Sequence, residues 1–101
     1  MKHLIAVALL SVSTLANAGT FDICPDSGKS AYLIMKARQR GVDMSRMMEI
    51  ASSSGIAELD ALNKSLTIDA YKVPRYSTPE NQQKAAEDFR DRLLLECYTR
   101  K

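Results

Sequence analysis

The sequence STPENQQKAAEDFRDRLLLECY, residues 77–98, carries the clearest helix signal in the chain and sets the expected architecture. Ser77 and Glu80 have the spacing of a capping box, and a proline stands between them in the first turn. Apolar residues then recur at helical spacing and define the expected buried face: Ala85, Ala86, Phe89, Leu93, Leu94 and Cys97. We therefore expect a helix from this start to about Tyr98, with Cys97 on its buried side.

Cys97 has one potential partner, because the chain contains only one other cysteine, Cys24. In an oxidising compartment, two cysteines near opposite ends of a small domain predict a disulfide. The bridge would join the first helix to the last and make them antiparallel neighbours. Through the entropy of loop closure it would contribute roughly 4 kcal/mol. That is similar to the roughly 3–5 kcal/mol expected of so small a core.

The first helix of the exported part is expected between residues 26 and 40. Residues 20–24 read as a short extended lead into it. Three residues after this lead offer N-cap oxygens: Asp26, Ser27 and Ser30. The helix should end at Arg40, because Gly41 can adopt the left-handed conformation that ends many helices.

Two more helices are expected before the last one. Asp43 or Ser45 caps a short second helix, which ends in the turn sequence of residues 52–55. A third helix is marked by one apolar stripe: Ile56, Leu59, Leu62, Leu66 and Ala70. It should end before Pro74. Since no window alternates with a period of two, the sequence predicts an all-α fold, a small single-domain bundle of four helices clamped by one disulfide.

Residues 1–18 have the features of a secretory signal peptide. Lys2 and His3 precede an apolar run, and Ala16-Asn17-Ala18 is a small-residue cleavage site. The run is too short to span a bilayer, and no cysteine directly follows the site to carry a lipid anchor. We therefore expect cleavage near Ala18 and one domain over residues 19–101, periplasmic or secreted, with no transmembrane span.

The composition of residues 19–101 argues against several function classes. Without Lys2, the 14 Lys and Arg become 13, against 12 Asp and Glu, and the two signs are interspersed. No basic face for nucleic acid is therefore expected. The only histidine is His3 in the signal peptide, which removes histidine-based triads and zinc sites. We expect no enzyme, no catalytic residue, no metal site and no cofactor.

The segment AYKVPRYS, residues 70–77, is the best candidate for a binding surface. Tyr71, Arg75 and Tyr76 are of the residue types that dominate binding hot spots, and Pro74 stiffens the backbone between them. In the alternative interpretation both tyrosines fill the seam between two helices. Arg75 then pairs with a carboxylate or caps carbonyls at a helix end.

The order of these features also resembles a known group. It comprises a signal peptide, an early cysteine, a helix ending in Arg-x-Gly-Val, the sequence Ala-Tyr-x-x-Pro-Arg-Tyr-Ser-Thr, Asp88-Phe89-Arg90 and a late cysteine. In these respects the chain resembles small exported proteins of Gram-negative bacteria and their prophages. The resemblance implies export and a helical, disulfide-bonded domain, and it implies no activity or catalytic residue.

Three functions are compatible with the sequence. The first is an exported, non-catalytic protein-binding module, of an immunity, inhibitor or phage-exclusion type, whose partner is another periplasmic or envelope protein. The second is an acid- or stress-type periplasmic chaperone, in which protonation of the carboxylates drives unfolding. The third and most remote is a Cu(I) carrier that uses thioethers. Its ligands would be Met35, Met44, Met47 and Met48.

Overall fold

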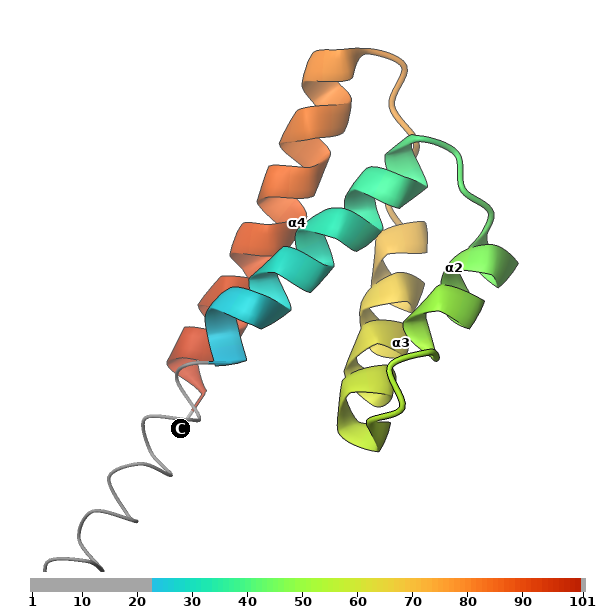
Figure 1. The fold of residues 1–101 in the computed structure, drawn as a ribbon. Coiled ribbons are helices and arrows are strands. Elements are labelled where there is room, and N and C mark those ends of the chain that lie inside the picture. Colours follow the sequence, from blue (N-terminus) through green and yellow to red (C-terminus); the bar gives the residue numbers. More distant parts are fainter. Residues whose placement is uncertain (1–22, 101) are drawn as a thin grey trace, which may run out of the picture.

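The computed structural model describes residues 23–100, which form four helices and no strand (Figure 1). The first helix covers residues 23–39 and is followed by α2 (Met44–Ala51), α3 (Ala57–Tyr71) and α4 (Pro79–Thr99). The predicted all-α fold with one Cys24–Cys97 disulfide is confirmed. The predicted signal peptide, residues 1–18, lies outside the described residues. Among the four described helices, none combines the length and the hydropathy of a bilayer span.

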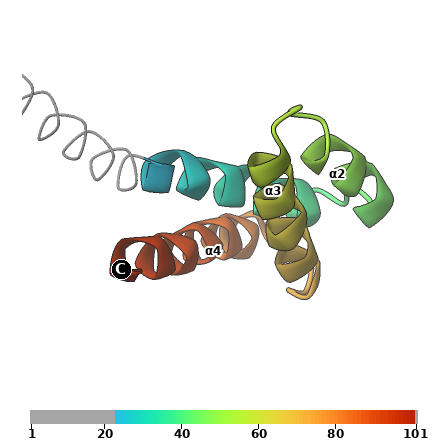
Figure 2. The same cartoon turned by 90° about the horizontal axis from the view of Figure 1, so that it is seen from below.

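The first helix and α4 are not consecutive in the chain, but they pack antiparallel along their length, and we call this pair the first hairpin (Figures 1 and 2). Four contacts follow each other from the disulfide to the opposite end: Cys24 with Cys97, Gly28 with Leu94, Tyr32 with Arg90, and Lys36 with Gln83. The Cα atoms of the two cysteines lie 5.8 Å apart. At Gly28 the helices approach so closely that an added Cβ would lie 2.7 Å from a methyl carbon of Leu94.

The start of the first helix differs from the sequence-based expectation. Residues 23 and 24 are already helical, so Cys24 does not belong to an extended lead. The three expected N-cap residues, Asp26, Ser27 and Ser30, lie inside the helix. The prediction considered local capping alone, whereas the disulfide and the contact at Gly28 hold this turn against α4.

The end of the first helix was predicted correctly. Gly41 has a φ of 89°, in the left-handed region. Its N–H donates to the carbonyl of Arg38 over 3.1 Å, and the N–H of Val42 donates to the carbonyl of Ala37 over 3.1 Å. These two bonds form a Schellman motif, which satisfies carbonyl groups that the helix would otherwise leave unpaired.

The short helix α2 and the first turns of α3 form a second hairpin (Figure 2). Asp43, and not Ser45, caps α2, because its Oδ1 accepts from the N–H of Arg46 over 2.9 Å. The turn to α3 contains Gly55 at a φ of 81°. It is fixed by Asp60, whose Oδ1 accepts from the N–H of Ser54 over 3.0 Å.

The N-cap of α4 is one residue later than expected. The hydroxyl of Thr78 accepts from the N–H of Asn81 over 3.2 Å, and Pro79 occupies the first helical position. The expected capping box between Ser77 and Glu80 is therefore wrong. Proline is most favourable at the first helical position, where its missing N–H would have no partner inside the helix.

The core lies where both hairpins meet, and it leaves part of α3 uncovered. Its buried members come from all four helices: Ala31, Ile34, Met35, Ala37, Met47, Leu66, Ala70, Ala86 and Phe89. Of the predicted stripe on α3, Leu66 and Ala70 are buried, whereas Ile56 is 56% exposed and Leu59 is 37% exposed. The stripe therefore exists in the sequence, but only its C-terminal half packs against the first helix and α4.

Candidate functional site

The connector between α3 and α4, residues 72–78, is held against the end of the first helix by one buried side chain. Gln39 is only 1% exposed. Its Nε2 donates to the carbonyl of Pro74 over 2.9 Å, and its Oε1 accepts from the N–H of Tyr76 over 2.8 Å. Both the donor and the acceptor of the Gln39 amide are therefore paired with connector backbone, which fixes the backbone position of Tyr76.

Two arginines complete this attachment. Arg75 Nε donates to the carbonyl of Gln39 over 2.9 Å, and its guanidinium lies over Gly41, where an added Cβ would come within 2.9 Å of Cζ. Arg38 Nε donates to the carbonyl of Val73 over 3.1 Å. Arg75 thus caps a carbonyl at a helix end, as the alternative interpretation of the sequence predicts.

Tyr71 lies in the seam between α3 and the first helix. Its hydroxyl donates to the carbonyl of Val42 over 2.5 Å, and the guanidinium of Arg38 lies 5.0 Å from its ring centre. Burial raises the pKa of Tyr71; Arg38 opposes this shift and Asp43 adds to it. The neutral, hydrogen-bonded phenol is therefore the form that the fold favours.

Of the three predicted binding residues, Tyr76 is the one whose side chain borders a groove. Tyr71 and Arg75 are engaged with the end of the first helix, whereas Tyr76 is 39% exposed. Tyr76 lines two of three adjoining hollows that follow one face of α4, and we call the three together the α4 groove. The groove is lined by Leu66, Asp69, Lys72, Val73, Tyr76, Asn81, Lys84, Ala85, Asp88, Phe89, Arg92, Leu93 and Glu96, with the deeply buried Met35 at its base.

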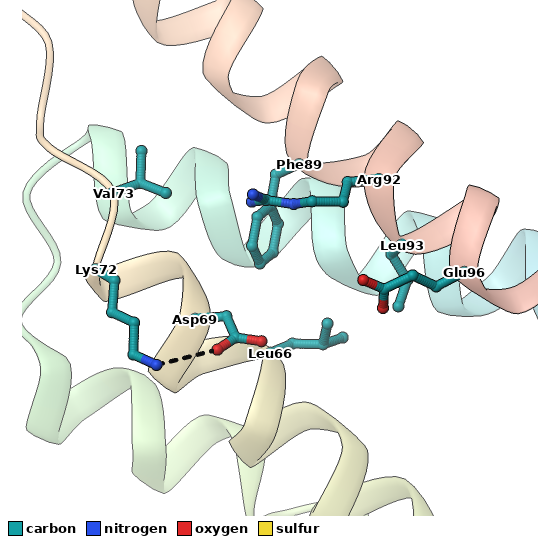
Figure 3. Close-up of a pocket in the computed structure, with 8 residues that line it drawn as sticks. All are labelled: Leu66, Asp69, Lys72, Val73, Phe89, Arg92, Leu93 and Glu96. Atoms are coloured by element: carbon teal, nitrogen blue, oxygen red, sulfur yellow. Dashed lines mark ion pairs between the residues drawn. The ribbon is translucent and has the colours of Figure 1, made fainter.

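The largest hollow of the α4 groove has a volume of about 440 Å³ and lies between α3 and α4 (Figure 3). Leu66, Phe89 and Leu93 form its apolar floor. Arg92 extends over the ring of Phe89, with its guanidinium carbon 5.4 Å from the ring centre. The site is thus a trough with an apolar floor and charged walls, with a cation beside its aromatic ring, an arrangement that occurs at binding surfaces.

Charged side chains surround this floor, and most of them are paired. Lys72 lies 3.6 Å from Asp69 on α3, and Lys84 lies 2.9 Å from Asp88 on α4. The Asp88 carboxylate raises the pKa of Lys84, first through their hydrogen bond and then through its charge. These ion pairs leave Arg92 as the cation of the groove without a carboxylate within 4.0 Å among residues 23–100.

Sequence reasoning missed the two residues that define the site, Gln39 and Arg92. Gln39 follows Ala31 and Met35 at four-residue intervals, so a polar side chain on a buried face was the available signal. Arg92 stands outside the predicted buried face of the last helix. Its position three residues after Phe89 places it beside that ring on a helix.

The four methionines lie in different environments. Met35 and Met47 are buried in the core, Met48 is partly buried and Met44 is exposed. Among the described residues, no group of three or more His, Cys, Asp or Glu side chains is arranged to hold a metal ion. The burial of Met35 and Met47 is what a packing role requires, because methionine readily fills irregular cores.

Likeness to known proteins does not add to these observations. Comparison of the chain with protein-family models, with curated proteins and with solved structures gives no match. The α4 groove and the compartment that the sequence predicts are therefore the features that bear on function.

Proposed function

We propose that this chain is an exported, non-catalytic protein-binding module whose α4 groove receives a segment of another periplasmic or envelope protein. The observation that carries the proposal is the combination of an apolar floor with the exposed side chains of Tyr76 and Arg92. Tyrosine and arginine contribute most where they border a pocket that a partner can fill and desolvate. An immunity, inhibitor or phage-exclusion role would use such a surface.

The rigid attachment of the connector supports the same proposal. Gln39 holds the backbone N–H of Tyr76, and Gln82 Nε2 donates to its carbonyl over 2.8 Å. Because both backbone groups are fixed, less conformational entropy is lost when a partner immobilises the Tyr76 side chain. The Cys24–Cys97 disulfide is compatible with an oxidising compartment outside the cytoplasm.

The test is recovery of a partner from periplasmic extract of the source organism, with two matched pairs of variants. The groove pair is Tyr76→Ala with Arg92→Ala. The control pair is Tyr98→Ala with Arg46→Ala, because Tyr98 and Arg46 are exposed residues that do not line the groove. We expect a specific partner with the wild-type protein and the control pair, and at least tenfold less of it with the groove pair. Equal recovery by both pairs, or no specific partner at all, would contradict the proposal.

The uncovered half of the α3 stripe favours one second candidate, the acid-activated chaperone. Ile56 and Leu59 supply apolar surface that a client could contact. However, the ion pairs between described residues lie on the surface, where such pairs contribute little to stability. We therefore expect near-ultraviolet circular dichroism at pH 3 to retain the native signal. Loss of that signal together with suppression of client aggregation would replace the binding module by the chaperone.

A further inference from the structure

The charge pattern of the α4 groove restricts the chemistry of what can occupy it. The inference below rests on the proposed binding function and names the kind of segment that binds. Arg92 is exposed, and within residues 23–100 its guanidinium donates no hydrogen bond. Its guanidinium carbon lies 5.4 Å from the centre of the Phe89 ring. A planar guanidinium in this state is suited to a bidentate pair with a carboxylate.

The remaining charges limit the number of carboxylates to one. Asp69, Asp88 and Glu96 also line the groove, so a polyacidic segment would meet three carboxylates. A polybasic segment would meet Lys72, Lys84 and Arg92 in the same groove. A single carboxylate can pair with Arg92 while Asp69 and Asp88 stay paired with their lysines. A second carboxylate would meet Glu96, which lines the same hollow and has no ion pair among residues 23–100.

The apolar floor begins directly beneath Arg92 (Figure 3). Leu66, Phe89 and Leu93 line the same hollow of about 440 Å³. A ligand that uses both features must carry its carboxylate next to an apolar group. The C-terminal residue of a polypeptide has this arrangement, because its carboxylate and its side chain are bonded to the same Cα.

We propose that the α4 groove binds the C-terminal end of a partner polypeptide whose last side chain is apolar. The terminal carboxylate pairs with Arg92, and the last side chain lies on Leu66, Phe89 and Leu93. Tyr76, farther along the groove, contacts the residues that precede the chain end.

The experiment is a titration followed by the amide resonances of the full exported chain. The probes are acetyl-Ala-Ala-Leu with a free carboxylate, the same peptide with a C-terminal amide, and octanoate. We expect the free acid to shift the resonances of Leu66, Phe89 and Leu93 and to bind at least tenfold more tightly than the amide. Arg92→Gln should remove this difference and Arg92→Lys should reduce it, because lysine keeps the charge without the planar fork. Arg46→Gln should leave it unchanged.

Three results would overturn the proposal. They are equal binding of acid and amide, no shift with either peptide at millimolar concentration, and binding of octanoate without binding of the acid peptide. In each case a partner that depends on Tyr76 and Arg92 in the recovery experiment would still support the binding module. Failure of the chain-end proposal is therefore distinguishable from failure of the proposed function.

Discussion

The two helical hairpins of this molecule differ in how completely they are closed, because the first is closed from end to end and the second leaves part of α3 uncovered. The first helix and α4 meet from Cys24–Cys97 to Lys36–Gln83, whereas α3 leaves Ile56 and Leu59 exposed. The difference comes from side chains that fit one another. Gly28 leaves space for Leu94, and Tyr32 accepts from Gln83 over 2.7 Å. Apolar residues at helical spacing thus define one face of a helix. Complementary side-chain shapes and polar partners then determine how much of that face is covered.

Removal of the disulfide is expected to have the largest effect, because it tests why the first hairpin is closed. Cys24 and Cys97 are 73 residues apart in the sequence. Loop-closure entropy over this length predicts that the double change Cys24→Ser, Cys97→Ser lowers the free energy of unfolding by about 4 kcal/mol. Urea denaturation measures this loss. Hydrogen exchange should become faster first in residues 23–28. A change below about 1 kcal/mol would mean that packing alone closes the hairpin.

The next largest effect is expected at Gln39, which ties the connector to the closed hairpin. Gln39→Ala leaves the carbonyl of Pro74 and the N–H of Tyr76 without their partner, so we expect a loss of about 3 kcal/mol. Gln82→Ala is the control, because Gln82 contacts the same residue at its carbonyl from a less buried position. It should lose less than about 1 kcal/mol. Equal losses in urea denaturation would show that burial of the amide does not matter.

A comparison of two glycines tests the end of the first helix against the turn between α2 and α3. Gly41 and Gly55 both have a positive φ, 89° and 81°, so alanine at either position should lose about 1 kcal/mol through backbone strain. Gly41→Ala should lose about 1 kcal/mol more, because it displaces Arg75 from the carbonyl of Gln39. Nothing lies within 4 Å of an added Cβ at Gly55. In an Arg75→Ala background the two variants should have the same stability, and a remaining difference would assign the extra loss elsewhere.

The smallest expected effect appears at alkaline pH and concerns Tyr71, which lies in the seam between α3 and the first helix. Burial raises the pKa of Tyr71 above its usual 10.0, so the folded state keeps the phenolic proton longer than the unfolded state. The contribution of the Tyr71 phenol to the free energy of unfolding is therefore complete below pH 10, and it is lost as the pH rises through the folded-state pKa. Urea denaturation between pH 8 and 11.5 should show a shallower decline for Tyr71→Phe than for the wild type. Lys84, whose pKa is also raised, titrates alike in both proteins and cancels. Parallel curves would contradict the assignment.

Local sequence chemistry predicted those features that depend on a few neighbouring residues. Gly41 and Asp43 mark helix boundaries that need only backbone conformation and one side-chain oxygen, and both are as expected. The disulfide followed from the presence of two cysteines in a predicted exported domain. The alternative role of Arg75 as a helix cap was also accessible from its position after Pro74.

Features that depend on distant residues could not be predicted in the same way. The first helix includes Cys24 because α4 holds this turn in place, which no N-cap signal reports. Gln39 is buried because the connector, 35 or more residues away in sequence, returns to it. Arg92 belongs to a groove rather than to a uniformly solvated face because α3 lies opposite it. In each case a residue that is distant in sequence determines the environment of the side chain. The local sequence pattern would be the same if that neighbour were absent.

The link between Cys24 and Cys97 also gives the polypeptide the topology of a ring. A single backbone cleavage in the serine-rich turn at residues 52–54 would divide the chain into two fragments that remain one covalent molecule. On a non-reducing gel such a nicked protein should migrate as one species, and reductant should separate it into two. In the extracytoplasmic compartment that the sequence predicts, where proteases act on exposed turns, this topology means that one cut does not release either half.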